Sequence, residues 1–194
     1  MSAIGEITVY LIQTVAVIYT LLVILRFLLQ LAKADFYNPV SQFIVKATTP
    51  PLLILRRIIP GYFGIDMSAI VLAILVQVIA ITALILLFNG PILPTKILTW
   101  SLLNIVGLAG KFFYFSILAG IILSWVAPQS HHPLAQLIFQ INEPVMGPFR
   151  RLLPSMGGMD FSPIFVFITI NIINIMLRHA AASSGMYSII SFGI

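Results

Sequence analysis

The chain has 194 residues, of which 60% are hydrophobic and only 8% are charged, with ten Lys and Arg against five Asp and Glu. Soluble domains carry about 25% charged residues, so this composition excludes an ordinary soluble fold and indicates a membrane protein. The net charge of +5 is then expected at one membrane face rather than on nucleic acid. The absence of cysteine excludes disulfides and thiolate metal sites.

Four uncharged apolar runs are long enough to cross a bilayer, which takes about 20 helical residues. The first run follows Glu6 and lacks the basic start and the cleavage site of a signal peptide, so we expect a permanent helix there. The second is expected to end near Asn89, where a Gly-Pro pair follows. We predict an all-α, polytopic membrane protein with four transmembrane helices, at 5–31, 67–88, 99–127 and 161–182.

Basic residues are unevenly distributed between the connecting segments. The loop between the second and third predicted helices has only Lys96, and the tail has only Arg178. Lys111 lies inside the third predicted helix, and the two long connections and their borders hold the other seven, namely Arg26, Lys33, Lys46, Arg56, Arg57, Arg150 and Arg151. The positive-inside rule therefore predicts cytoplasmic long connections and both termini outside.

An internal repeat is the strongest signal in the sequence. The pattern Pro-x5-Arg-Arg-x2-Pro-x3-Gly-x-Asp-x-Ser runs from Pro50 to Ser68 and again from Pro144 to Ser162, a constant offset of 94 residues. Each unit, 1–94 and 95–194, carries two spans, so the repeats must be parallel and could be related by an axis along the membrane normal. Such an axis permits a channel or a symmetric docking surface without implying either.

Each repeat has a proline-bounded apolar segment between its spans, at 39–59 and 133–153. Both segments are too short and too interrupted by charge to cross the membrane. Proline suits the first turn of a helix, so Pro39 and Pro50 are each expected to open a short helix. Pro60 is expected to end the second of them. We therefore predict an interfacial amphipathic helical hairpin in each repeat, with apolar side chains in the headgroup boundary.

Two interpretations of the arginine pairs are open. In the first, the basic residues set the topology and contact anionic lipid headgroups; these are Lys46, Arg56, Arg57, Arg150 and Arg151. In the second, the arginines pair with Asp66 and Asp160 and clamp the hairpin to the next helix, or bind a partner.

The duplicated acidic and hydroxyl residues before the second helix of each repeat have a simpler expected role. Asp66, Ser68, Asp160 and Ser162 lie where helix caps lie, and a side-chain oxygen there can accept from exposed helix amides. The preceding glycines, Gly64 and Gly158, are expected to let the chain turn back.

Ionisable groups in the predicted spans are costly there and often functional. Lys111 lies in the middle of 99–127. Either this helix is long and Lys111 faces the bundle, or 97–110 lies along the outer surface and the span begins near Phe112. Arg26, near the end of the first helix, is expected to extend its guanidinium to the interface.

Uncharged polar residues also occur in the spans. Gln77 and Asn171 are repeat equivalents, and Asn174 lies one turn further. Interhelical hydrogen bonding is the expected role of these intramembrane amides, and lining a polar path is the alternative. A face of small residues at four-residue spacing indicates close helix packing; it consists of Ser116, Gly120 and Ser124.

No catalytic or metal-binding pattern is visible. The acids are few and dispersed, and the sequence has no phosphate-cradling glycine loop. His131 and His132 are adjacent, so they would point to different sides of a helix or lie in a loop. We expect no enzyme, no metal and no cofactor.

Several runs together are typical of one known family. They are Asp35 to Phe43 (DFYNPVSQF), Pro50 to Pro60 with its arginine pair, Arg150 to Pro163 (RRLLPSMGGMDFSP), Ser124-Trp125-Val126 and the lysine of the third span. In these runs the chain resembles the YggT (YlmG-related) membrane proteins over nearly its whole length. The copies differ, since Ala69 replaces Pro163 and Pro51-Leu52-Leu53 replaces Val145-Met146-Gly147, so the halves could be unequal in role.

The resemblance implies an inner-membrane protein of bacteria, with links to osmotic-shock tolerance and potassium uptake. Other relatives are linked to cell division or nucleoid distribution, and plastid relatives to cytochrome assembly. No catalytic residue can be carried over. We therefore expect a non-enzymatic protein that organises anionic lipids or partner proteins and supports osmotic-stress tolerance, with a membrane-protein partner or a second copy and no nucleic acid. The alternative is a channel or transport component for an ion such as potassium or for a small solute.

Overall fold

The structure is a computed structural model that describes residues 3–61, 66–128, 131–152 and 160–194. Within these ranges the regular structure is helical: α1 (Ala3–Leu31), α2 (Pro39–Arg56), α3 (Met67–Leu87), α4 (Pro94–Val126), α5 (Pro133–Leu152) and α6 (Ser162–Ser183). Four of them, α1, α3, α4 and α6, are long and apolar enough to cross a membrane. The predicted all-α, four-span membrane fold is thus confirmed.

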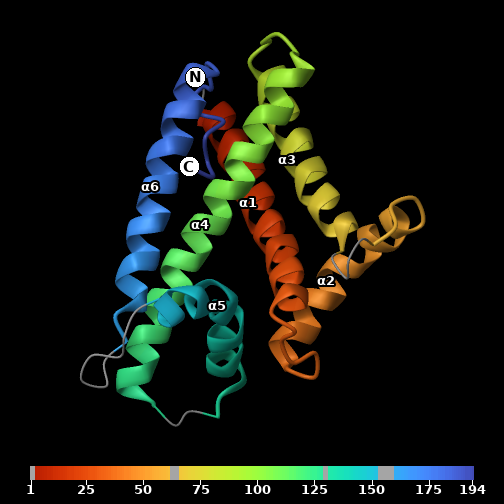
Figure 1. Ribbon diagram of the computed structural model, residues 1–194. Helices are drawn as coiled ribbons and strands as arrows, with labels where there is room; N and C mark the ends of the chain where they lie inside the picture. The colour runs from red at the N-terminus through yellow and green to blue at the C-terminus, as the bar shows by residue number, and fades with distance from the viewer. Residues whose placement is uncertain (1–2, 62–65, 129–130, 153–159) are drawn as a thin grey trace.

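The two halves have the same orientation. The start of α1, the α3–α4 connection and the end of α6 lie at one end of the molecule, and α2 and α5 lie at the other (Figure 1). We call that second end the α2–α5 face. In each half, the first span packs on both the short helix and the second span, α1 on α2 and α3, and α4 on α5 and α6.

The third span is a single helix of 33 residues. It begins at Pro94, earlier than predicted, because proline is favoured in the first turn. At 1.5 Å per residue it is about 50 Å long, well beyond the roughly 30 Å of a hydrocarbon core. The segment 97–110 is therefore continuous with the span and does not form a separate surface helix.

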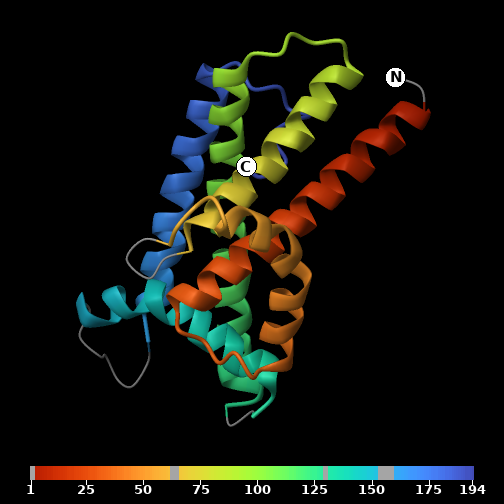
Figure 2. The same ribbon diagram turned by 90° about the vertical axis from the view of Figure 1, so that its right-hand side faces the viewer.

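The α2–α5 face is built by two bent helices. Each carries prolines in its interior, Pro50 and Pro51 in α2 and Pro144 and Pro148 in α5. Proline removes a backbone hydrogen bond and bends the helix, and both helices change direction along their length (Figures 1 and 2). The structure thus assigns one bent helix where two short ones were expected from Pro39 and Pro50.

The starts of these two helices are tied together. Asn38 caps α2, since its Oδ1 accepts from the Val40 amide at 2.9 Å. Its Nδ2 donates to the main-chain oxygen of Pro133, at the start of α5, at 2.7 Å. One buried side chain therefore links the two repeats at the α2–α5 face.

The packing between the halves is asymmetric. α3 packs on α4, but α6 makes no corresponding contact with α1 in the described ranges. The tail 184–194 turns back from the end of α6 toward the bundle interior (Figure 1). Gln13 of α1 donates to the Ile189 main-chain oxygen at 2.7 Å, and Asn104 of α4 donates to that of Ile190 at 2.9 Å. The tail thus connects α1 to α4 from within.

Candidate functional site

In the first repeat, an ion pair joins the end of α2 to the start of α3. Both Nε and Nη2 of Arg56 donate to Oδ2 of Asp66, the Nε bond at 3.2 Å. The Asp66 side chain is only 7% exposed, so a nearby cation is needed to stabilise its charge. Asp66 occupies the N-cap position of α3, but its side chain makes no cap hydrogen bond. The expected capping role is wrong for Asp66, because the guanidinium takes the carboxylate.

The same ion pair recurs in the second repeat. Nε of Arg150 donates to Oδ2 of Asp160 at 2.8 Å, and its Nη1 donates to Oε2 of Glu143, which lies seven residues earlier in α5. The other oxygen of Asp160 accepts from the amide of Ser162, the first residue of α6, at 2.9 Å, although the N-cap position itself is Phe161. This cluster is open to solvent, since the Asp160 side chain is 42% exposed.

These contacts shift two pKa values at the α2–α5 face. Burial alone would raise the pKa of Asp160, but hydrogen bonds from Ser162 and Arg150 outweigh it and leave this pKa below its ordinary value. Burial alone would lower the pKa of Arg150, but its bonds to Asp160 and Glu143 outweigh that effect and raise the pKa.

Within each arginine pair the two residues have different surroundings. Arg56 and Arg150 are held by carboxylates. Arg57 and Arg151 are exposed and form no ion pair with any described residue, and Lys46 on α2 is also exposed. We call the Arg56–Asp66 and Arg150–Asp160 ion pairs the two clamps. Each arginine pair thus has one residue in a clamp, as in the second interpretation, and one exposed residue that could contact lipid, as in the first.

The two serines of the repeated motif are buried. Ser68 does not cap a helix; its hydroxyl donates to the Ile59 main-chain oxygen at 3.3 Å and ties α3 to the chain after α2. Ser162 contributes its amide to Asp160. Gly64 and Gly158, expected to let the chain turn, lie outside the described residues.

Arg26 does not extend to the interface as expected. It is 8% exposed, and Nη1 is buried without a hydrogen-bond partner among the described residues. It lies within electrostatic range of Arg56 and Asp66, so the first repeat has a third charged group behind its clamp. The side chain is enclosed by the protein instead, and no ion pair with it occurs among the described residues.

A cavity of about 670 Å³ lies behind the second clamp, between α4, α5 and α6. Its polar lining comes from Asn142, Glu143, Arg150 and Asp160, and its apolar lining includes Ile117, Ile121, Trp125, Ile164 and Phe167. Asn142 is 3% exposed, and its Oδ1 has no hydrogen-bond partner in the described structure. Gly120 and Ser124 of the predicted small-residue face line this cavity, so the face lies against α5.

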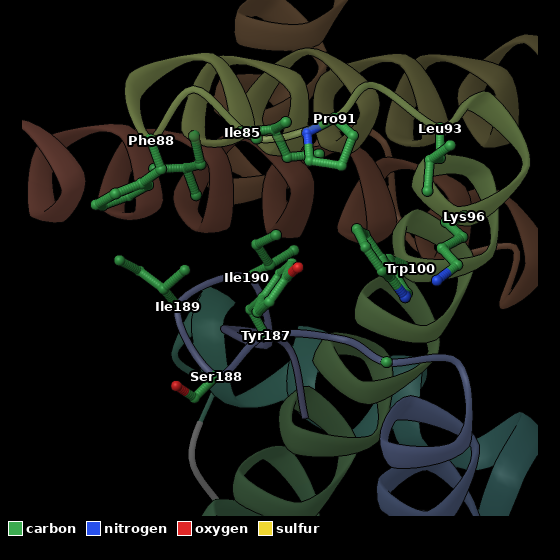
Figure 3. A pocket seen from close by; sticks show the side chains of 13 residues that line it. Ile85, Phe88, Pro91, Leu93, Lys96, Trp100, Tyr187, Ser188, Ile189 and Ile190 are labelled. Carbon is green, nitrogen blue, oxygen red and sulfur yellow. The ribbon is translucent and has the colours of Figure 1, made fainter.

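A second cavity, of about 450 Å³, lies at the opposite end of the molecule between the α3–α4 connection and the tail. Figure 3 shows Lys96 and Trp100 on one side of it and Tyr187 and Ile190 on the other. Trp100 donates to the Ser184 hydroxyl at 3.0 Å and meets the Tyr187 ring edge-on. Its lining is mostly apolar. No sequence pattern predicts this cavity, because residues of the tail form one of its walls.

A buried polar layer joins three spans and the tail. Gln77 of α3 donates to the Thr20 hydroxyl at 2.9 Å and accepts from Asn104 at 3.2 Å, as expected of an interhelical amide. Asn104 also accepts from the Gly193 amide at 3.2 Å. Thr20 and Asn104 were not predicted to belong to this layer. Asn104 could have been found, because it is an uncharged amide inside a predicted span, as Gln77 is.

The other intramembrane polar residues are less enclosed. Asn171, the equivalent of Gln77, is exposed on α6, and Asn174 is half-buried against Gly110 of α4. Of the two alternatives for Lys111, the long continuous helix is the one observed, and the lysine is exposed along it. Its Nζ donates to the main-chain oxygen of Ile194 at 3.2 Å, so the contact that it makes is with the tail.

The described ranges contain no group of three or more His, Cys, Asp or Glu side chains that could hold a metal. His131 and His132 are both exposed ahead of α5. The chemistry available at the α2–α5 face is therefore electrostatic and hydrogen-bonding, between two clamps, free basic side chains and one polar cavity.

Comparison with known proteins agrees with the duplicated architecture. The family model described as CCB3/YggT matches twice in tandem, over residues 5–87 and 99–181. An uncharacterized protein of Pseudomonas aeruginosa is 46% identical over 189 residues, covering 96% of each chain. The uncharacterized protein YggT of Escherichia coli is 35% identical over 178 residues, covering 91% of this chain and 92% of its own. No solved structure matches.

Proposed function

The chain belongs to the CCB3/YggT family, and we propose that it is a non-enzymatic protein of a bacterial inner membrane that organises anionic lipids, and partner proteins with them, at its α2–α5 face. The observation that carries the proposal is the division of labour within each arginine pair. Arg56 and Arg150 are neutralised by carboxylates of their own chain, whereas Arg57 and Arg151 are exposed beside them.

The clamps give the free arginines a fixed place. Each ion pair ties the end of a bent helix to the start of a span, at Asp66 and at Asp160. Arg57 and Arg151 directly follow the paired arginines, Arg56 and Arg150. The ion pairs therefore also hold these exposed side chains near the starts of α3 and α6. A basic side chain near an anionic membrane surface contributes about 1 kcal/mol, so Arg57, Arg151 and Lys46 together would favour anionic lipid around this protein.

The membrane topology is part of the proposal. The positive-inside rule assigns the α2–α5 face to the cytoplasm and the opposite end, with the start of α1 and the end of α6, to the outside. The role in osmotic-stress tolerance, and the inner membrane as location, follow from the family resemblance. Basic surfaces rigidly joined to spanning helices would let lipid and partner contacts respond to changes in the bilayer.

The test replaces the exposed arginines alone. The double variant Arg57→Gln/Arg151→Gln is reconstituted in nanodiscs of mixed phosphatidylglycerol and phosphatidylcholine, and the lipids that copurify are quantified by mass spectrometry. We expect the enrichment of phosphatidylglycerol to fall by about thirtyfold, from two contacts of about 1 kcal/mol each.

The matched control is Lys96→Gln/Arg178→Gln, which removes the same charge at the opposite end of the molecule. It should keep the enrichment of the wild-type protein. Equal phosphatidylglycerol enrichment in the wild type and in Arg57→Gln/Arg151→Gln would contradict the proposal.

A second candidate function is an ion or small-solute pathway, and the buried layer of Thr20, Gln77 and Asn104 favours it. In this alternative the tail is a plug, held at its end by Lys111. Potassium flux in liposomes under an osmotic gradient, altered by Lys111→Met, would support it. The absence of flux from folded, correctly oriented protein would contradict it. Lipid organisation is better supported, because the polar groups of this layer are paired with one another and with the tail.

A further inference from the structure

The two repeats differ at one position behind their clamps. Arg26 of α1 and Gly120 of α4 are equivalent, 94 residues apart. In the first repeat the buried Arg26 side chain fills the space near Arg56 and Asp66. In the second repeat Gly120 has no side chain, and the cavity of about 670 Å³ lies there. The first repeat thus supplies its own cation where the second has an open space.

The charge around that space also changes sign. The first cluster has two cations, Arg26 and Arg56, and one acid, Asp66. The second has one cation, Arg150, between two acids, Glu143 and Asp160. Glu143 is the equivalent of Thr49, so an acid is gained in the same repeat that loses the arginine. The second cluster therefore complements a positively charged group.

A buried amide side chain lies beside the same space. Asn142 is 3% exposed, and the atom nearest to a Cβ placed at Gly120 is its Nδ2, at 3.5 Å. Its equivalent in the first repeat is Thr48, whose hydroxyl donates to the Ile44 main-chain oxygen at 2.7 Å. The acceptors that the cavity offers to a group rich in N–H donors are therefore the two carboxylates, Glu143 and Asp160.

The apolar walls identify what must be attached to that group. They come from the spans α4 and α6, and several of their side chains face outward; Trp125 is 83% exposed and Ile164 is 52% exposed. Along a span, such exposed apolar side chains meet lipid tails. A volume of about 670 Å³ lies within the ordinary range for small-molecule sites, roughly 300–1,000 Å³. The fitting ligand therefore has a cationic donor head and hydrocarbon chains.

We propose that this cavity binds the primary ammonium headgroup of a phosphatidylethanolamine-type lipid, which takes the place that the Arg26 guanidinium has in the first repeat. The ammonium group has three N–H donors, which the carboxylates of Glu143 and Asp160 can accept. The acyl chains lie along the exposed apolar surface of α4 and α6. The inference deepens the proposed lipid-organising function by naming a lipid class. It rests on residues other than Arg57 and Arg151, so the two can fail separately.

The experiment compares headgroups that differ only in their N–H donors. The full-length protein is placed in nanodiscs of phosphatidylglycerol with equal amounts of phosphatidylethanolamine and phosphatidylcholine of the same chains, and retained lipid is measured by native mass spectrometry. We expect phosphatidylethanolamine to be retained about tenfold over phosphatidylcholine, because a quaternary ammonium has no N–H to donate to a charged acceptor. Equal retention would overturn the proposal.

Two variants localise the site. Glu143→Gln removes an exposed acid, and Gly120→Arg places in the cavity the side chain that the first repeat has. Each should abolish most of the preference for phosphatidylethanolamine. The fold is checked by thermal unfolding. If Gly120→Arg does not fold, Gly120→Met takes its place; the position can accept side-chain atoms, because a Cβ there meets nothing closer than 3.5 Å. An unchanged preference in folded Glu143→Gln and in the folded Gly120 variant would overturn the assignment.

Two further arms separate the sources of the signal. Arg57→Gln/Arg151→Gln should lose the phosphatidylglycerol enrichment and keep the phosphatidylethanolamine preference, which distinguishes this site from the basic surface. Soluble ethanolamine should compete only at concentrations far above those of the lipid, because it lacks the hydrocarbon chains. Competition at equal concentration would show that a free small amine is the ligand, and would overturn the lipid assignment.

Discussion

Arg150 donates from Nε to Oδ2 of Asp160 at 2.8 Å, across ten residues of sequence and from the end of α5 to the start of α6. Arg56 and Asp66 make the same connection, also across ten residues, between α2 and α3. The two clamps differ in their surroundings, since the Asp66 side chain is 7% exposed and that of Asp160 is 42% exposed. One duplicated motif thus produces a buried clamp and an open one, and their responses to mutation and to pH should differ.

Loss of the buried carboxylate should be the more damaging change. Asp66→Asn leaves the buried Arg26 and the 40% exposed Arg56 without a counter-charge. Breaking a fully buried pair costs about 3–5 kcal/mol, and the exposure of Arg56 should keep the loss below that range. Asp160→Asn breaks an exposed pair, worth about 0–1 kcal/mol. The free energies of unfolding of both variants, measured by denaturant titration in mild detergent, check this. Equal destabilisation by the two substitutions would contradict the difference in burial.

The open clamp should weaken in acid. The pKa of Asp160 lies below its ordinary value, so its charge stabilises the folded state above the unfolded-state pKa, about 3.9. That stabilisation is lost as the pH falls from about 4 through the folded-state pKa. The stability difference between the wild type and Asp160→Asn should therefore be constant near neutral pH and vanish in acid. A difference that persists or grows below that range would show that Asp160 does not titrate as part of this clamp.

The spans and the repeat were predictable because the bilayer imposes them. A helix must carry about 20 apolar residues to cross, and the 94-residue offset links Pro50 to Pro144 without a gap. The Arg–Asp clamps were available from the sequence as one of two alternatives. The spacing in the sequence could not show which arginine of each pair would form the ion pair with the aspartate. That depends on the direction of each side chain at the end of the bent helix.

The tail and the cavity were not predictable, for two different reasons. Residues 184–194 are held through their main-chain atoms by Gln13 and Asn104, and main-chain contacts leave no pattern in the side chains. The cavity arises from a missing side chain at Gly120, which the sequence presents only as a helix-packing residue. Comparing the two repeats position by position could have suggested it, because the equivalent residue is the charged Arg26.

The buried amide layer should hold the tail in place. Asn104→Leu removes the bonds to Gln77, to the Ile190 oxygen and from the Gly193 amide. Interhelical hydrogen bonds in membranes are worth about 0.6 kcal/mol each on average, so the helices should remain assembled while the tail is released. Hydrogen exchange of 184–194 should speed up markedly. Asn171→Leu, on the exposed face of α6, is the control and should leave this exchange unchanged.

The tail also depends on a close approach between two glycines. A Cβ at Gly107 would lie 2.3 Å from the Gly193 main-chain oxygen, closer than any real contact, and the obstructing atom is backbone that cannot rotate away. Gly107→Ala should therefore push the tail off α4 while α4 itself is unharmed, since alanine favours a helix. Gly120→Ala is the matched control, because its Cβ would have ordinary contacts of 3.5 Å or more.

The measurement for these two alanine variants uses the absence of natural cysteine. A single cysteine is introduced at Ile189, whose side chain is half-buried in the tail and whose main-chain oxygen keeps its bond from Gln13. The rate at which a maleimide labels this cysteine reports release of the tail. Labelling should speed up severalfold in the Gly107→Ala background and stay at its original rate with Gly120→Ala. If Gly107→Ala labels as slowly as the parent, the tail does not need the glycine contact and is held by its hydrogen bonds alone.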